Sequence, residues 1–459
     1  MSGNVKKRRT AWAKPFIALS VGAALLASPG LAAPAAAAAA TSAYEDAADY
    51  SLFLEEKYAI DYQGVATKGQ YLESVADVLG ARHSGAEVAF RDLNADGDVY
   101  PAAAALYEQG VLTADTVGAE KKLTPAAAVF VAVKAAGLQE LANTYPQEKI
   151  DRALAKLKRK SAALTPQAAK ELAAAVDTGL LPAEYYGEFY AGAGQPASPE
   201  LIETLLGKIL TFNGKYKRYI GYVSDHDIVA KLTAAYASSG LIAAPELRDA
   251  ADAALRQNLV TGYNLKDSRF DPNFVQSLSL TYGHDNLKHA IQLIGLLRSE
   301  HIDAKVQFEP KTSAFIYLKE WGEPQETEDY RVVQIENGNY IAYAKEYDIS
   351  FEFERAADKE KFDAIVTAYA KKDSDDEPNL LAGSWWQPLY YSLTELDNYE
   401  VITNNKFSDG RYYVQSFSLN DDAAAVAEGF RRLAPDAKTE SYRFWVDKPF
   451  FRYLNGESE

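Results

Sequence analysis

Residues 90–100 read Phe-Arg-Asp-Leu-Asn-Ala-Asp-Gly-Asp-Val-Tyr and lead into an apolar, alanine-rich segment that stops at Gly110. A polar loop follows, and Leu123-Thr124-Pro125 then opens a second apolar segment that stops at Gly137. A hydroxyl residue before proline is typical of a helix N-terminus, and glycine is typical of the residue just after a helix. Residues 90–138 are therefore predicted to form a helix-loop-helix unit.

Related segments lie on both sides of this unit. Thr67 and Ser198 each precede a run with apolar residues at helical spacing, and Leu164-Thr165-Pro166 opens a further one. One such unit cannot bury its own apolar face, so several must pack together. We therefore expect an N-terminal all-α bundle of three helix-loop-helix units, at about residues 44–85, 86–145 and 146–211.

The three predicted units resemble S-layer homology (SLH) domains of bacterial surface proteins. In that family, three units form a helical bundle that binds pyruvylated secondary cell-wall polysaccharide, and the Arg of a Thr-Arg-Ala-Glu motif contacts the polymer. Here the Arg position corresponds to Lys68, Pro125 and Pro199, and only Lys68 keeps the positive charge. The resemblance implies that the bundle associates with cell-wall polysaccharide or another surface protein, with Lys68 as the candidate contact.

The acidic loop before the second unit has two interpretations. Asp92, Asn94, Asp96 and Asp98 fall at the spacing of calcium ligands in a calcium-binding loop. The twelfth position, which normally supplies a carboxylate, is Ala103. We therefore favour a turn in which Asp92 and Asn94 cap the following helix. Bound Ca²⁺, which would make the chain a calcium-stabilised adhesion module, is the alternative.

The N-terminus has the features of a secretion signal. Four basic residues at 6–9 precede an apolar stretch over residues 16–31 and an alanine-rich stretch that ends near residue 40. We predict that residues 1–43 form a signal peptide and that the mature protein is extracellular, at a Gram-positive cell wall or surface. No later segment is apolar enough to predict a membrane span.

Charge and cysteine content exclude several classes of function. The formal net charge is −16, and it becomes −21 without residues 1–43, which carry five Lys or Arg and no Asp or Glu. Such an acidic chain is repelled by nucleic acid and by anionic lipid. The sequence contains no Cys, so disulfides, thiolate metal sites and cysteine nucleophiles are excluded together.

Beyond residue 211 the composition changes, because alanine becomes rarer and short alternating apolar runs appear between helical segments. Alternating runs are predicted at residues 277–282, 304–308, 314–318, 331–335, 340–344, 350–353, 411–419 and 440–446. Such a mixture indicates an α+β domain with an antiparallel sheet over residues 212–459. The predicted fold class is thus an all-α bundle followed by an α+β domain.

Residues 283–322 show a weaker resemblance to the core of transglutaminase-like domains. In that family a Cys begins a helix that feeds a strand, and a second strand carries the catalytic His. The Cys position corresponds to Asn286 and the His position to about Lys311. An amide cannot replace a thiolate nucleophile, so the resemblance implies a degenerate scaffold without catalysis.

The remaining residues give no catalytic assignment. The five His residues do not form a recognisable metal motif, and no nucleophile elbow or phosphate-binding loop occurs. Late aromatic residues, including Tyr412, Tyr413 and Phe444, are interpreted mainly as core, with a glycan-binding platform as the alternative. We therefore expect a non-catalytic, exported surface protein. The alternative is an extracellular enzyme that acts on wall peptide or glycan through the C-terminal domain.

Overall fold

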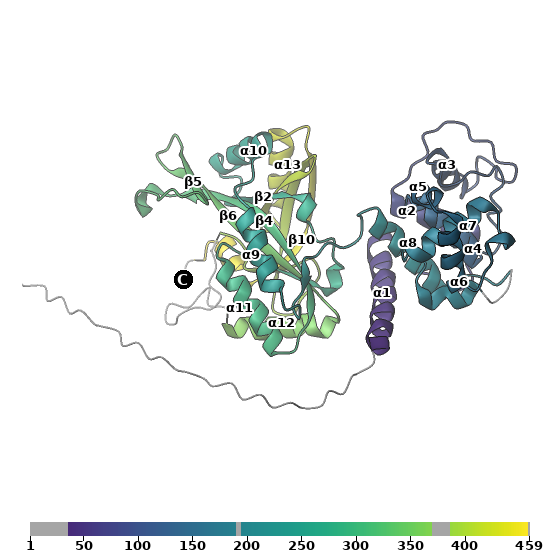
Figure 1. Ribbon diagram of the computed structural model, residues 1–459. Helices are drawn as coiled ribbons and strands as arrows, with labels where there is room; N and C mark the ends of the chain where they lie inside the picture. The colour runs from purple at the N-terminus through teal and green to yellow at the C-terminus, as the bar shows by residue number, and fades with distance from the viewer. Residues whose placement is uncertain (1–34, 190–193, 370–385, 458–459) are drawn as a thin grey trace, which may run out of the picture. The chain divides into compact units, whose positions relative to one another are not determined.

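The computed structural model describes residues 35–189, 194–369 and 386–457. The chain divides into two units at residue 45, and the second unit, residues 45–459, is compact. Most of the predicted signal peptide, residues 1–43, lies outside the described residues. The second unit contains all the elements discussed below, together with most of helix α1 (Figure 1).

The first half of the second unit is helical. Thr67, Thr124, Thr165 and Ser198 each cap a helix, because each side-chain oxygen accepts a hydrogen bond from the backbone N–H three residues later. The helix starts predicted at these four residues are confirmed. The α-helices are α1 (Ala35–Tyr58), α2 (Lys68–Leu79), α3 (Tyr100–Glu108), α4 (Pro125–Ala135), α5 (Gln139–Asn143), α6 (Gln147–Lys156), α7 (Pro166–Asp177) and α8 (Pro199–Phe212).

The second half combines strands with further helices. The strands are β1 (Gly221–Tyr222), β2 (Gly262–Asp267), β3 (Ser279–His284), β4 (Ala304–Tyr317), β5 (Tyr330–Gln334), β6 (Tyr340–Phe353), β7 (Tyr390–Ser392), β8 (Glu400–Asp409), β9 (Tyr412–Ser418) and β10 (Lys438–Val446). The helices are α9 (Ile228–Ser238), α10 (Pro245–Arg256), α11 (Leu287–Ser299), α12 (Ala356–Tyr369), α13 (Ala423–Leu433) and α14 (Lys448–Leu454).

Eight of these strands close into an antiparallel barrel. They are hydrogen-bonded in the order β4-β2-β9-β8-β10-β7-β3-β6, and β6 pairs back to β4 from Ala304–Phe353 to Tyr317–Tyr340. The two extra strands lie at edges of this ring, β1 on β4 and β5 on β6. The predicted fold class is therefore wrong. The chain is not an all-α bundle followed by an α+β domain with a simple antiparallel sheet, because eight strands of its sheet close into a barrel.

Two long strands explain why closure was missed. The predicted strands at 304–308 and 314–318 are parts of β4, and those at 340–344 and 350–353 are parts of β6. Pro310 interrupts the apolar pattern in β4. It lies between the residues that pair with β1 and those that pair with β2. Its missing N–H therefore breaks no pairing with either of these strands. Charged residues likewise interrupt the apolar pattern in β6.

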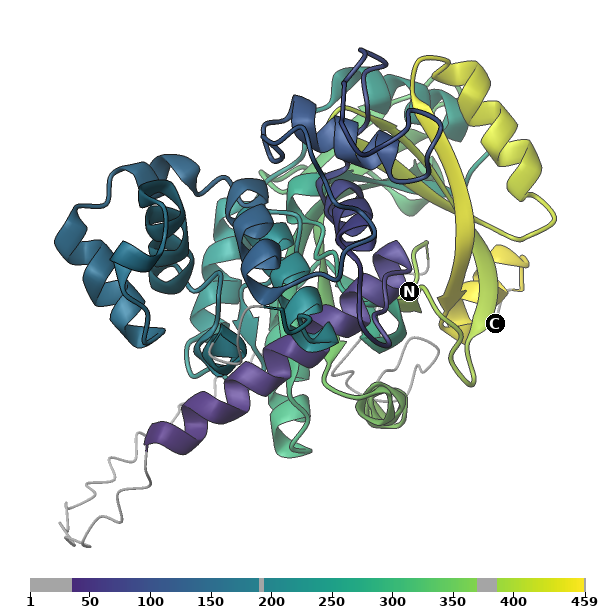
Figure 2. The same cartoon turned by 90° about the vertical axis from the view of Figure 1, so that its right-hand side faces the viewer.

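The barrel has a polar interior and an apolar exterior. On β6, Glu346, Asp348 and Ser350 alternate with Tyr347 and Ile349, and all five are buried. Successive strand residues point to opposite faces, and the apolar set packs in a core with residues of α9, α11 and α12. Helices α10 and α13 cover another part of the outer face, where they pack against β2, β8 and β9. In Figure 2 the yellow helix α13 lies along the outer side of the curved strands.

Candidate ligand site in the barrel

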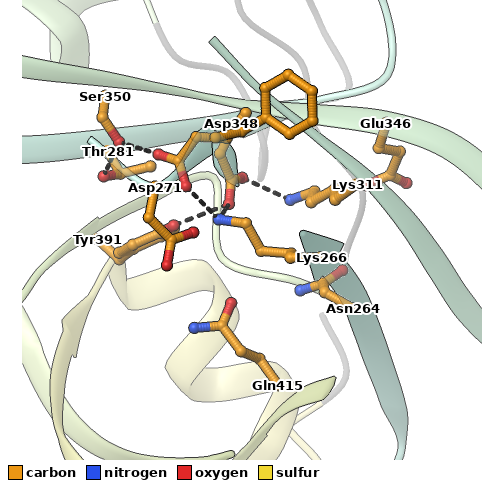
Figure 3. Close-up of polar contacts among 12 residues, drawn as sticks. Asn264, Lys266, Asp271, Thr281, Lys311, Glu346, Asp348, Ser350, Tyr391 and Gln415 are labelled. Atoms are coloured by element: carbon orange, nitrogen blue, oxygen red, sulfur yellow. Dashed lines mark hydrogen bonds and ion pairs between the residues drawn. The ribbon is translucent and has the colours of Figure 1, made fainter. Parts of the chain in front are cut away.

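Buried ion pairs link the strands inside the barrel. Lys266 Nζ on β2 lies 2.7 Å from Glu309 Oε2 and 2.9 Å from Asp348 Oδ2. Lys311 Nζ lies 2.6 Å from the other oxygen of Asp348. Tyr391 on β7 donates a 2.8 Å hydrogen bond to the same carboxylate. Figure 3 shows the side chains of Lys266, Lys311, Asp348 and Tyr391 pointing toward one another from four different strands. Asp348 is therefore the centre of the network.

The two carboxylates bound to Lys266 have opposite pKa shifts. Burial alone would raise the pKa of Asp348, but the Lys266 and Lys311 cations lower it to about 2. Burial raises the pKa of Glu309 to about 6, because its single cationic neighbour, Lys266, offsets the loss of water only in part. Asp348 is therefore ionised at neutral pH, and Glu309 gains a proton under mildly acidic conditions.

Glu346 forms a second polar centre next to Lys311. Its carboxylate accepts a 2.7 Å hydrogen bond from Ser313 and a shorter one from the side-chain amide of Gln387. Lys311 Nζ is 3.9 Å away. Burial raises the pKa of Glu346 to about 7, and the Lys311 charge reverses only part of that shift. Glu346 is thus close to half-protonated at neutral pH.

Gly283 leaves the space that this network needs. A Cβ atom at this position would lie 2.8 Å from Asp348 Oδ1 and 2.9 Å from Lys311 Nζ. Gly283 on β3 is directly opposite Asp348 on β6 in the ladder. The absence of a side chain at residue 283 therefore allows the Asp348–Lys311 ion pair to form against β3.

A cavity of about 260 Å³ adjoins the network. Lys266 and Glu309 form part of its wall, so one edge of the charged network faces the cavity. Several aromatic side chains also line it, and Asp271, Lys406 and Gln415 are among its polar groups. Its aromatic lining residues are Phe274, Tyr391, Tyr413, Tyr442 and Phe444. Eight-stranded barrels are just wide enough to hold one small molecule in this way.

The polar groups in the cavity wall are held in place by hydrogen bonds and stacking. Tyr413 donates a 2.6 Å hydrogen bond to Asp271. Lys406 Nζ lies 4.1 Å from the centre of the Tyr413 ring, a cation–π distance. Gln415 Nε2 donates a 3.0 Å hydrogen bond to the hydroxyl of Tyr442. These contacts fix a carboxylate, an ammonium and an amide around two tyrosine rings.

A segment at the cavity rim is fixed by two side chains of opposite charge. The Glu56 carboxylate on α1 accepts hydrogen bonds of 2.5 and 3.0 Å from the N–H groups of Gln276 and Ser277. Lys359 Nζ on α12 donates to the two carbonyls of the same residues, at 3.2 and 3.4 Å. Gln276 also lines the cavity. The rim thus depends on residues 220 and 83 positions away in sequence.

The two positions from the transglutaminase-like resemblance have separate roles. Lys311 is buried in the barrel network. Asn286 instead precedes α11, and its side chain accepts a 3.0 Å hydrogen bond from the N–H of Lys288. The structure therefore explains Lys311 as part of an ion pair and Asn286 as a helix cap.

The acidic loop has its own internal role. The Asp92 carboxylate accepts hydrogen bonds of 2.9 and 2.7 Å from the N–H groups of Val117 and Gly118. Asp92 therefore ties the loop to residues 117–118 rather than capping α3, whose N-terminus has no side-chain cap. The predicted capping by Asp92 and Asn94 is wrong at this helix. Asn94, Asp96 and Asp98 are exposed in the same loop.

Lys68 lies at a pocket in the helical half. This pocket has a volume of about 220 Å³, and Lys134 also lines it. Its other walls are mostly apolar, with Leu112 and Phe130 among them, and no Asp or Glu lines it. The structure therefore places the one candidate polymer contact at a concave, positively charged surface.

Sequence reasoning missed the residues that form the barrel site. Lys266 and Lys406 belong to β2 and β8, which were not predicted as strands. Tyr413 and Phe444 were noted as possible glycan contacts, although a core role was favoured. The signal that could have found the network is the period of two in Glu346-x-Asp348-x-Ser350, which places three polar side chains on one strand face.

Within residues 35–189, 194–369 and 386–457, no group of three or more His, Asp or Glu side chains is placed to hold a metal ion. The helices in these ranges also include none that is both long enough and apolar enough to cross a membrane. No protein family, curated protein or solved structure matches this chain.

Proposed function

We propose that this chain is an exported binding protein whose barrel cavity holds one small, hydroxyl-rich molecule, such as a single saccharide unit. The observation that carries the proposal is the cavity wall, which combines tyrosine rings with a carboxylate, an amide and an ammonium group. Export is supported by the sequence of residues 1–43.

Cavity size favours a small ligand. A volume of about 260 Å³ is slightly below the range typical of drug-sized ligand pockets. The strands around it fix its width, because a closed sheet cannot open without breaking a ladder. A single sugar ring suits these dimensions better than an extended chain does.

Wall chemistry favours a neutral molecule with many hydroxyl groups. The rings of Tyr413 and Tyr442 offer apolar faces. Amphipathic aromatic residues suit ligands that have one apolar side and one polar side. Asp271 accepts hydrogen bonds, Lys406 donates them, and Gln415 does both. Opposite charges in one small cavity disfavour a ligand of strong single charge.

Isothermal titration calorimetry of the purified chain with glucose, galactose, N-acetylglucosamine and glucuronate tests this proposal. We expect at least one sugar to bind, and Gln415→Leu and Lys406→Met to weaken binding about tenfold each. Lys438→Met is the matched control, because Lys438 is an exposed lysine on β10. No heat of binding with any sugar, or equal affinity in all variants, would contradict the proposal.

A second candidate function is suggested by the Lys68 pocket. Two lysines in a pocket without acidic residues would attract an anionic polymer locally, even though the whole chain is acidic. The resemblance to SLH domains favours a cell-wall polysaccharide. Sedimentation with cell-wall sacculi tests it. Lys68→Met and Lys134→Met should each reduce the amount of protein that sediments with the sacculi. Lys160→Met, at an exposed lysine, should not. Sedimentation that is equal in all forms would exclude this site.

A further inference from the structure

A third pocket lies on the outer side of the strands, at the end of α9. Its volume is about 380 Å³, within the usual range for small-molecule sites. It shares no lining residue with the barrel cavity. Tyr412 lines this outer pocket and Tyr413 lines the inner cavity, because neighbouring strand residues point to opposite faces.

Apolar side chains form most of the outer pocket. Phe308 and Pro310 of β4 are buried there, and Phe270 is partly exposed at 37% of its surface. Leu241 and Ile242, which follow α9, complete the apolar part of the lining. An apolar body of several carbon atoms would therefore lose contact with water by entering it.

Arginine makes one part of the pocket positive. Arg269 forms a bidentate pair with the buried carboxylate of Asp267: Nε donates to Oδ1 at 3.1 Å, and Nη2 donates to Oδ2 at 2.7 Å. Arg411 Nε lies 3.5 Å from the same carboxylate and its Nη2 donates to Tyr412. Two guanidinium groups thus share one carboxylate, and Nη1 of Arg269 lies outside the bidentate contact. Because the side chain of Arg269 is 58% exposed, a ligand can reach it.

The remaining part of the pocket repels anions. Helix α9 ends at Ser238, and the C-terminus of a helix carries partial negative charge. The hydroxyls of Ser238 and Ser239 already donate to carbonyls of the last turn. An anionic group is therefore favoured near Arg269 and disfavoured near α9.

We propose that the outer pocket binds a small carboxylic acid with an apolar body, its carboxylate at Arg269 and its apolar part against Phe308 and Leu241. Arginine recognises carboxylates well because its planar donors match the two oxygens. The neighbouring Asp267 holds the guanidinium in position. This site is independent of the barrel cavity and would operate whether or not the barrel binds sugar.

Calorimetry with phenylacetate and hexanoate tests the proposal, with phenylacetamide and hexanamide as uncharged controls of matched shape. We expect at least one acid to bind, and its amide to bind about tenfold more weakly. Arg269→Gln should weaken binding of the acid about tenfold. Arg431→Gln should have no effect, because Arg431 is similarly exposed and paired with a single carboxylate on α13.

Leu241→Glu provides a second variant that leaves the Arg269–Asp267 pair intact. The new carboxylate in the pocket wall should repel the acid and reduce its affinity about tenfold, with little change for the amide. The proposal is overturned if neither acid binds, if acid and amide bind equally, or if both Arg269→Gln and Leu241→Glu keep the affinity of the unmodified chain.

Discussion

Lys266 on β2 and Asp348 on β6 form a buried ion pair of 2.9 Å, although β4 lies between their strands in the sheet. The contact therefore spans the polar side of the sheet, which is the inside of the barrel. Each partner has a further charged contact, Glu309 for Lys266 and Lys311 for Asp348. The four charges balance, so the network is electrically neutral when all four groups are ionised.

Removing the ammonium group of Lys266 should destabilise the barrel strongly. In Lys266→Met, Glu309 and Asp348 would lose their shared cation while they remain buried. Breaking a buried ion pair in this way costs about 3–5 kcal/mol. Urea unfolding followed by tyrosine fluorescence measures the change. Lys438→Met, at an exposed lysine, should change stability by less than about 0.5 kcal/mol. Equal stability of the two variants would show that the buried pair is absent.

Two glycine substitutions separate the packing of the network from general effects of added methyl groups. Gly283→Ala places a Cβ within 3 Å of Asp348 and Lys311, so we expect a loss of about 1–3 kcal/mol. Gly295 lies within α11 and has no atom within 4 Å of an added Cβ. Gly295→Ala should therefore stabilise the chain by up to about 1 kcal/mol. Thermal unfolding of both variants tests the prediction, and a stabilised Gly283→Ala protein would contradict it.

Because of Glu346, the free energy of unfolding of the chain should fall as pH rises. Its folded pKa is raised to about 7 from an ordinary value of 4.5, so its favourable contribution is complete below pH 4.5 and is lost as pH rises through 7. Replacing the carboxyl by an amide removes this titration. Between pH 5 and pH 8, the unmodified chain should lose about 2 kcal/mol relative to Glu346→Gln.

Urea unfolding of both proteins at pH 5 and pH 8 measures this difference. Asp348 titrates in the opposite sense, because its pKa is lowered to about 2 and its contribution is lost only in strong acid. It therefore does not mask the effect of Glu346 in this window. If the two proteins have the same pH dependence, Glu346 is not buried as described.

The rim segment should become mobile when Glu56 is neutralised. Glu56→Gln weakens the hydrogen bonds to the N–H groups of Gln276 and Ser277, at a cost of about 1–2 kcal/mol. Hydrogen exchange at these two amides should become faster. Glu55→Gln is the matched control, because Glu55 is exposed on the same helix. Unchanged exchange in Glu56→Gln would show that α1 does not hold the rim.

Local signals in the sequence were sufficient for the helix starts. A hydroxyl followed by proline marks Thr124, Thr165 and Ser198, and each is a helix cap in the structure. Such capping is decided by contacts within four residues, so it can be read from a short segment.

The barrel could not be predicted by the same reasoning. Closure depends on β6 pairing with both β3 and β4, over separations of many residues that no local pattern encodes. The prediction also assumed that strands bury apolar residues on their inner face. Lys311, Glu346 and Asp348 break that assumption, since they are buried by ion pairs and hydrogen bonds. In the sequence, these charged residues were therefore interpreted as the ends of separate short strands.

The candidate site depends on the same long-range pairing. Lys406 of β8 and Tyr413 of β9 meet because these strands are neighbours, and Asp271 reaches Tyr413 from 142 residues away. None of the three carries a motif that marks it as a ligand contact. A late cluster of aromatic residues was visible in the sequence, but only the strand register shows which rings face the cavity.

The central claim is that the polar barrel holds a small hydroxyl-rich molecule beside Tyr413 and Tyr442. A crystal structure of the chain with the tightest-binding sugar of the calorimetry panel tests it most directly. The account predicts one sugar ring in the cavity, within hydrogen-bond distance of Asp271, Lys406 or Gln415. A sugar bound only elsewhere on the chain, or an open sheet with β4 and β6 unpaired, would contradict it.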